Sequence, residues 1–255
     1  MNSADHKESF EAIYRKRGFV STWVEKSPSM YANMGYLQRN QKILSLATIY
    51  GTARPNILDI GCGTGDVLRL LYLYSIGISG IDISDINVDN CKRNLGGIKW
   101  PKDIRQGLAE DLPYPNNEFD MVIMADVIEH VLDPLLSIQE AYRVLDINGV
   151  LILTTPVKYM DQFWSFLNKP FTDHNEPVAK DVLFSERELN LLIKGRGFIV
   201  QTHEVGEFYP RWVPLYKIAE QLPFFTKPIC KGVEKLKLFN YRQYIVGRKM
   251  CQTSL

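Results

Sequence analysis

One short segment restricts the fold more than any other part of the chain. Residues 56–66 read Asn-Ile-Leu-Asp-Ile-Gly-Cys-Gly-Thr-Gly-Asp, an apolar run followed by three alternating glycines. Gly61, Gly63 and Gly65 allow a sharp turn and let the backbone approach a ligand where a Cβ atom would clash. Because residues 67–72 then suit a helix, the segment predicts a strand, a tight ligand-binding loop and a helix.

Short apolar runs recur along the rest of the chain, and helix-compatible segments separate most of them. The candidate strands are 56–60, 78–83, 104–107, 119–124, 150–155, 198–205 and 241–246. The runs at 121–124 and 150–153 are apolar at every position, which is typical of central strands that helices cover on both faces. The alternation therefore predicts an α/β fold with a doubly wound, mostly parallel sheet.

The 255 residues, of which 45% are hydrophobic, are enough for one complete core. We expect a single domain over 1–255 whose parts follow one another along the chain. They are a helical lead-in at 1–50 with its best helix at 35–50, a cofactor-binding core at 51–155, and substrate-side insertions at 156–184 and 206–240. The second insertion is expected to be helical and to precede the last strand. A helix at 185–194 begins with the spacing of a capping box.

Charge and cysteine content narrow the surroundings in which the protein works. Thirty basic and 29 acidic side chains leave a formal charge of +1, so no nucleic-acid partner is expected. The four cysteines lack the spacing of a zinc site or a disulfide framework, which favours the reducing cytoplasm. The first ten residues lack the apolar stretch of a signal peptide, and no run reaches the ~18 apolar residues of a membrane span.

Residues around the glycine loop distinguish between nucleotide ligands. A dinucleotide fingerprint would place its third glycine where this chain has Asp66, whose charge disfavours a pyrophosphate at the helix start. A phosphate-binding P-loop would need Gly-Lys-Ser or Gly-Lys-Thr, which does not follow the glycines. Asp82 ends the second candidate strand; alone it would suit a helix cap, but beside the glycine loop it is placed to bind ribose hydroxyls.

Four segments in order give the chain a family resemblance. They are 58–65, 80–84, 109–115 with Phe119-Asp120, and 128–131, and a later 142–145 with Gly149 extends the similarity, which covers about residues 39–155. The chain resembles the class I, Rossmann-like S-adenosylmethionine-dependent methyltransferases. The resemblance implies a seven-stranded sheet, S-adenosylmethionine as cofactor, S-adenosylhomocysteine as product, and methylation of a small molecule, as in enzymes that methylate quinone precursors.

The resemblance also implies which residues contact the cofactor. From its amino-acid end through the ribose to the adenine, and then beside the pocket, these are Asp59, Gly61, Cys62, Gly63, Gly65, Asp82, Ile83, Leu108, Ala109, Glu110 and Ala125. The family commonly has an acidic or amide residue where this chain has Leu108. Adenine recognition can therefore shift to Glu110, Asp111 or backbone groups.

The cofactor is itself an activated electrophile, so the protein chiefly has to align an acceptor and exclude water. An amine or alcohol acceptor would also need a base, for which His130 is the candidate and His174 the second choice. In a purely structural interpretation, Glu129 and His130 hold the loop after the fourth strand by hydrogen bonds. His6 and His203 are expected at the surface, and no metal site is predicted.

Aromatic side chains are concentrated at 159–171 and 207–240, and lysines are interspersed in the second stretch. These stretches suit either a subdomain packed on the core or an amphipathic lid for a lipid-like acceptor that touches an anionic membrane. The alternatives to a methyltransferase are a non-catalytic partner protein that binds S-adenosylmethionine and a nicotinamide-dependent Rossmann oxidoreductase.

Overall fold

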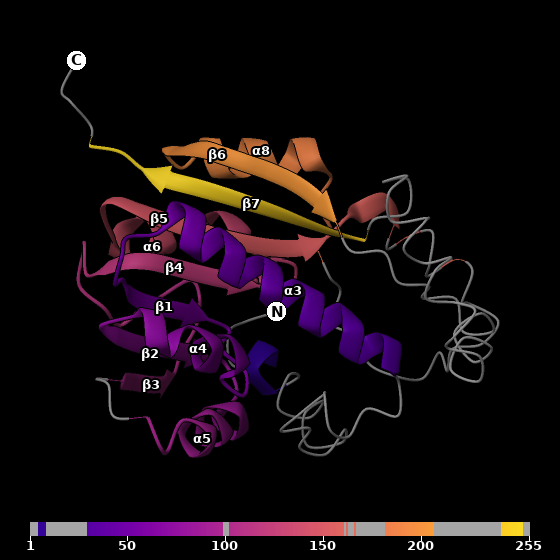
Figure 1. Ribbon diagram of the computed structural model, residues 1–255. Helices are drawn as coiled ribbons and strands as arrows, with labels where there is room; N and C mark the ends of the chain where they lie inside the picture. Colours follow the sequence, from indigo (N-terminus) through magenta and orange to yellow (C-terminus); the bar gives the residue numbers. More distant parts are fainter. Residues whose placement is uncertain are drawn as a thin grey trace.

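The computed structural model describes residues 5–8, 30–98, 102–160, 162, 166, 182–206 and 241–251. In these residues seven strands form one sheet in the order β3-β2-β1-β4-β5-β7-β6 (Figure 1). The strands are β1 (Asn56–Ile60), β2 (Gly77–Asp82), β3 (Lys102–Gln106), β4 (Phe119–Ala125), β5 (Leu145–Pro156), β6 (Phe198–Gly206) and β7 (Arg242–Lys249). The strands β1 to β5 pair in parallel, and β7 runs antiparallel to β5 and β6. The predicted doubly wound, mostly parallel α/β fold is confirmed.

Helices cover both faces of this sheet. They are α3 (Met30–Tyr50), α4 (Asp66–Leu71), α5 (Asp85–Asn94), α6 (Pro134–Val144) and α8 (Glu186–Lys194), with a short 3₁₀ helix, η1 (Tyr72–Tyr74), after α4. The helices α3, α4 and α5 share one buried apolar cluster with the sheet, and α6 and α8 share the other (Figure 1). The sheet therefore forms the middle of three layers.

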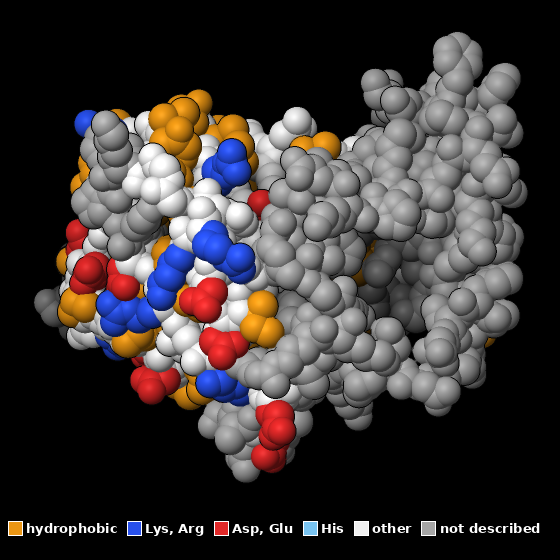
Figure 2. Space-filling model, turned by 90° about the horizontal axis from the view of Figure 1, so that it is seen from below, with side chains coloured by type: hydrophobic (Ala, Val, Ile, Leu, Met, Phe, Trp, Pro, Cys, Tyr) orange, Lys and Arg blue, Asp and Glu red, His pale blue; other side chains and the backbone are white. Residues whose placement is uncertain are grey.

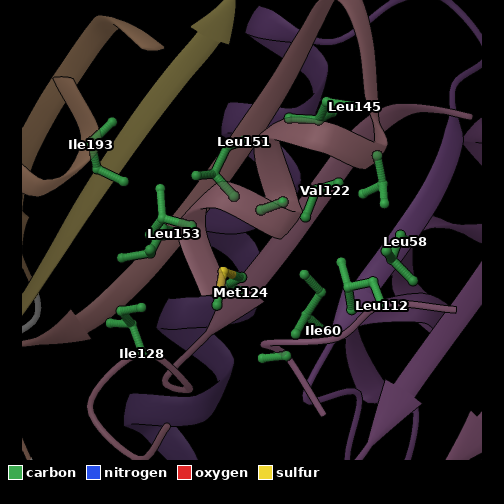
Figure 3. Packing of buried hydrophobic residues seen from close by; sticks show 14 of the residues in the cluster. Leu58, Ile60, Leu112, Val122, Met124, Ile128, Leu145, Leu151, Leu153 and Ile193 are labelled. Carbon is green, nitrogen blue, oxygen red and sulfur yellow. The ribbon is translucent and has the colours of Figure 1, made fainter. Parts of the chain in front are cut away.

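The continuous apolar runs are explained by this layering. Along β4, Val122 and Met124 point to the face of α6 and α8, where Leu58 and Ile60 of β1 lie beside them (Figure 3). Met121 and Ile123 point to the opposite cluster. Because side chains alternate between the two faces of a strand, a central strand with helices on both sides must be apolar throughout.

Local sequence signals account for several helix starts. Ser185 and Glu188 form the predicted capping box at the start of α8. Ser84 caps α5, and Asp133 caps α6, with Pro134 in the first turn. These caps fix where each helix leaves the loops at the carboxyl edge of the parallel strands.

The observed bounds differ from the predicted ones at some ends. The helix expected at 35–50 begins at Met30, and the strand expected at 150–155 begins at Leu145. Leu145 pairs with Phe119 before a register shift, and Asn148 adopts a left-handed φ of 67° within the irregular stretch. A bulge of this kind hides the start of a strand from an apolar pattern because the residues inside it are exposed.

Two expectations about histidines are wrong. His203 is half-buried, and its Nε2 lies 3.0 Å from Oε1 of Gln243. His6 is buried, with 6% of its surface exposed. Tertiary packing between segments far apart in the chain buries His6 and covers part of His203.

The second insertion, expected at 206–240, lies outside the described residues beyond Gly206, and most of the first, 156–184, lies outside them too, as does His174. None of the helices in the described part of the chain is long and apolar enough to span a bilayer. On the described part of the face seen in Figure 2, basic and acidic side chains are interspersed instead of being gathered by sign.

Candidate functional site

The glycine loop leaves β1 at the carboxyl edge of the sheet and turns back under β2. The amides of Gly61 and Cys62 both donate to the carbonyl of Ile81, at 2.7 and 3.0 Å. Gly61 has a φ of 70°, and a Cβ atom there would lie 2.3 Å from Cγ2 of Val127. This position therefore requires glycine for both its conformation and its packing.

Gly63 differs from Gly61 in what surrounds it. Its φ is also left-handed, at 52°, but nothing lies within 4 Å of the place where a Cβ atom would stand. At Gly65, in contrast, a Cβ atom would lie 2.8 Å from Sγ of Cys91. The loop is thus packed against protein at both ends and open in the middle, which leaves a cradle beside Gly63 for a ligand.

Asp82 holds this open part of the loop in place. Its Oδ2 accepts a hydrogen bond from the amide of Gly63 at 2.9 Å, and its Oδ1 accepts from the amide of Ser84 and from Nδ2 of Asn87 at 3.0 and 3.1 Å. Burial raises the pKa of Asp82, and these three hydrogen bonds oppose the shift. A carboxylate offers about four acceptor positions, so one remains for a ligand hydroxyl.

Asp59 presents the opposite case, a buried carboxylate with little support. Only 2% of its surface is exposed, and its Oδ1 has no hydrogen-bond partner in the described part of the chain. Burial raises the pKa of Asp59 to about 8, although the charge of Arg39 opposes the shift. A buried acceptor without a donor is costly, so a cationic or hydrogen-bonding group of a ligand would stabilise it.

The loop after β3 supplies the next group of predicted contacts. Leu108 forms an isolated bridge with Asp111, and Ala109 is buried. Glu110 is turned toward the chain itself, because its Oε1 accepts from the amides of Leu132 and Asp133 at 2.7 and 3.2 Å. The carboxylate of Glu110 therefore joins this loop to the start of α6, and its role toward adenine stays a prediction.

At the end of β4, Ala125 is followed by a charged cluster that sequence reasoning missed. Asp126 has a φ of 58° and accepts from Nε and Nη2 of Arg242 at 2.9 and 2.7 Å, from Arg39 at 3.1 Å and from Thr154 at 2.8 Å. Burial raises the pKa of Asp126, but the two guanidinium groups and Thr154 outweigh it and lower the pKa to about 2.

This cluster of Asp126, Arg39, Arg242 and Thr154 joins α3, β4, β5 and β7 at the carboxyl edge. The guanidinium of Arg39 also acts electrostatically on Asp59, which places the lead-in helix next to the glycine loop. A charged residue inside a predicted strand, such as Arg242, was the signal that could have found the cluster, because a buried charge needs a partner.

Glu129 and His130 follow on the same loop after β4. Glu129 is 2% exposed, and its Oε2 accepts from the hydroxyl of Thr155 at 2.9 Å. Burial raises the pKa of Glu129 to about 7; the charge of Asp126 adds to the shift and that of His130 opposes it. The loop-holding interpretation thus fits Glu129, while His130 is half-buried beside it and stays a candidate base.

The predicted cofactor contacts come from the ends of β1 to β4 and their loops, so the parallel sheet gathers them along one edge. Such an edge is where ligands bind in open α/β sheets. In the described residues no group of three or more His, Cys, Asp or Glu side chains is arranged to hold a metal ion.

Comparison with known proteins supports the resemblance to methyltransferases. Residues 58–153 match the family model described as a methyltransferase domain. The matched segment runs from β1 to β5, and these residues are similar to methyltransferase domains. The chain is 44% identical over 134 residues to 2-methyl-6-phytyl-1,4-hydroquinone methyltransferase 2 of Oryza sativa subsp. japonica, covering 51% of this chain and 36% of that protein.

A second relative is a ubiquinone biosynthesis O-methyltransferase of Azorhizobium caulinodans, 33% identical over 99 residues, which cover 39% of each chain. The matched part thus spans less than half the length of either relative. A solved structure from Pyrococcus horikoshii OT3 is similar over 92% of this chain and 98% of that one, with a TM-score of 0.64 and 19% identity. The structural likeness supports the fold and leaves the acceptor open.

Proposed function

We propose that this protein is an S-adenosylmethionine-dependent methyltransferase that methylates a small-molecule acceptor of aromatic or lipid-like character. The observation that carries the proposal is the pairing of the open cradle at Gly63 with the partnerless buried carboxylate oxygen of Asp59. The first leaves room for a ligand against the backbone, and the second calls for a donor or a positive charge. The amino-acid end of S-adenosylmethionine offers both a compact shape and an ammonium group.

The residues present fit this cofactor along the carboxyl edge. Asp59 would face its ammonium group, and Asp82 would bind its ribose with the acceptor position that the loop leaves free. The backbone of Leu108 and Ala109, and that of Ala125, would line the adenine and the pocket wall. When bound, the cofactor supplies a methyl group on a sulfonium centre.

The protein's own contribution is alignment and the exclusion of water. His130 lies on the loop after β4, beside the buried Glu129, and would take a proton from an acceptor hydroxyl or amine. An acidic phenol or an activated ring carbon would need less help. One relative is named as a hydroquinone methyltransferase and another as a ubiquinone biosynthesis O-methyltransferase, and these names support an aromatic acceptor.

The nicotinamide alternative loses support at the start of α4. Asp66 is the first residue of that helix, and its Oδ2 accepts from the hydroxyl of Thr64 at 3.0 Å. A fixed carboxylate at a helix N-terminus opposes a pyrophosphate. A non-catalytic binding protein is distinguished from an enzyme by turnover alone.

Calorimetric titration with S-adenosylmethionine and S-adenosylhomocysteine tests the proposal. Binding at micromolar concentrations is expected, and Asp82→Asn should weaken it at least about tenfold, or ~1.4 kcal/mol. The matched control is Asp89→Asn, because Asp89 is exposed on α5 away from the loop. A folded wild-type protein that binds neither ligand would contradict the methyltransferase assignment.

Acceptor chemistry is tested next, with radiolabelled methyl transfer to a panel of hydroquinones and catechols that carry or lack an apolar tail. Transfer to any of them establishes an enzyme, and His130→Ala should slow transfer to hydroxyl acceptors by about 10²-fold or more. Tight cofactor binding without transfer to any acceptor would favour the non-catalytic partner protein.

A further inference from the structure

The helical turn at residues 5–8 packs at the same edge of the sheet as the glycine loop, beyond the ends of β1 and β2 (Figure 1). Its His6 is 6% exposed. The imidazole of His6 makes a hydrogen bond to the backbone of His130 and lies near the carboxylate of Glu110. The loop after β3 and the loop after β4 therefore meet at this one side chain.

The same two loops are also joined to each other directly. Oε1 of Glu110 accepts from the amides of Leu132 and Asp133 at 2.7 and 3.2 Å, and Asp133 is the N-cap of α6. The segment proposed to hold the adenine and the segment that carries the candidate base thus form one hydrogen-bonded joint. A change in the position of either loop would therefore shift the other loop as well.

We propose that His6 is a positioning residue, which docks the turn at 5–8 on the joint between Glu110 and His130 and so holds both loops in the arrangement that receives cofactor and acceptor. The docking stands on burial and contacts alone; its consequence for binding rests on the proposed methyltransferase function. If His6 lay at the surface, as the sequence suggested, its replacement would leave the positions of both loops unchanged.

Protonation of His6 should oppose this docking. Burial lowers the pKa of His6, whereas the carboxylate of Glu110 and the hydrogen bond to His130 raise it, and the charge of His130 lowers it further. The titratable groups on the same turn are Asp5, Lys7 and Glu8. Because the docked imidazole disfavours a proton, docking is complete above the ordinary histidine pKa of roughly 6.5 and weakens as the pH falls below it.

Amide hydrogen exchange of the full, ligand-free chain measures the docking without any cofactor. In His6→Ala, exchange at 108–111 and 128–133 should rise about threefold or more at about pH 7.5. His6→Gln can donate the hydrogen bond but does not titrate. It should therefore restore the protection factors of both loops and lose the fall in protection factor that the wild type shows between about pH 7.5 and about pH 5.5. Glu8→Ala, an exposed change on the same turn, is the matched control.

Titration with S-adenosylhomocysteine then measures the consequence. His6→Ala should raise its Kd about threefold to tenfold, and His6→Gln should leave it near the wild-type value. Unchanged protection factors at both loops in His6→Ala would overturn the inference, as would a change of protection factor with pH in His6→Gln equal to that of the wild type. If the wild type shows the docking but binds no cofactor, the proposed function fails and the positioning role of His6 stands.

Discussion

At the scale of single residues, the site contains two buried carboxylates, Asp59 and Asp82. Burial raises the pKa of both, but the two differ in how many hydrogen bonds they accept. Asp82 accepts three hydrogen bonds from the protein, and Asp59 leaves one oxygen without a partner. The first arrangement stabilises the glycine loop by itself. The unpartnered oxygen of Asp59 lowers the stability of the ligand-free protein, and a bound ligand that donates to this oxygen would offset that loss.

Asp59→Asn should therefore separate stability from binding. Removing the buried charge is expected to raise the free energy of unfolding at about pH 8 by ~1 kcal/mol or more, because the pKa of Asp59 is raised to about 8. The same change should abolish measurable S-adenosylmethionine binding. Urea denaturation and calorimetry measure the two effects, and Asp82→Asn, which loses an acceptor that the loop uses, should destabilise the protein instead. A less stable Asp59→Asn would show that this carboxylate is structural.

Two glycines of the loop offer a second test at this scale. Gly61→Ala places a methyl group 2.3 Å from Val127 at a left-handed φ, whereas Gly63→Ala meets no atom within 4 Å. We expect Gly61→Ala to lower the free energy of unfolding by ~2 kcal/mol or more, and Gly63→Ala by only ~1 kcal/mol. Gly63→Ala should nonetheless weaken cofactor binding at least about tenfold, because it fills the cradle. Equal binding by wild type and Gly63→Ala would mean that the ligand lies elsewhere.

These residues show what the sequence could reveal of the site. The glycine loop and Asp82 could be predicted because their chemistry depends on spacing along one segment. The pairing of Asp126 with Arg39 and Arg242 joins residues 87 and 116 positions apart. Arg242 inside a predicted strand signals that a partner is needed, but no local pattern identifies that partner. The burial of His6 was missed for the same reason.

At the scale of elements, the charged cluster decides how α3 and β7 are held against the parallel strands. Arg39 of α3 and Arg242 of β7 share the carboxylate of Asp126 at the end of β4. A mostly buried carboxylate between two buried guanidinium groups keeps its charge and fixes both elements. The lead-in helix is thereby brought next to Asp59 and the cofactor edge.

Arg242→Met should test this connection. The change removes two of the hydrogen bonds to Asp126 and leaves its mostly buried charge with less compensation, so the free energy of unfolding should fall by ~3 kcal/mol. Lys42→Ala breaks an exposed ion pair with Glu204 between α3 and β6 and should cost less than ~1 kcal/mol. Thermal or urea unfolding measures both. Similar losses in the two variants would show that the cluster contributes no more than a surface pair.

At the scale of the whole molecule, the three-layer arrangement was predictable from the sequence. The antiparallel pair of β6 and β7 was predictable only in part. Apolar runs mark β1, β4 and β5 because both faces of these strands are covered, and the pattern needs no tertiary information. The direction of β7 depends on how the chain returns after residue 206, which no local pattern encodes. Most of the two insertions over which the acceptor was expected to bind lies outside the described residues.

The buried carboxylates together predict the pH dependence of stability for the entire fold. The pKa values of Asp59, Asp82 and Glu129 are raised, so the native state holds more protons than the unfolded chain above about pH 4, and stability falls as the pH rises toward 8. The pKa of Asp126 is lowered to about 2, so its contribution is present above about pH 4 and is lost as the pH falls toward 2.

The free energy of unfolding should accordingly be greatest near about pH 4. Urea denaturation across the pH range measures this maximum. Replacing Asp59 and Glu129 by their amides should flatten the loss between about pH 4 and about pH 8, because burial raises the pKa values of these two groups to about 8 and about 7. Asp126→Asn should flatten the acid side instead. A wild-type stability that keeps rising to pH 9 would show that the site carboxylates are ionised without cost, which would remove the reason for Asp59 to await a cationic ligand.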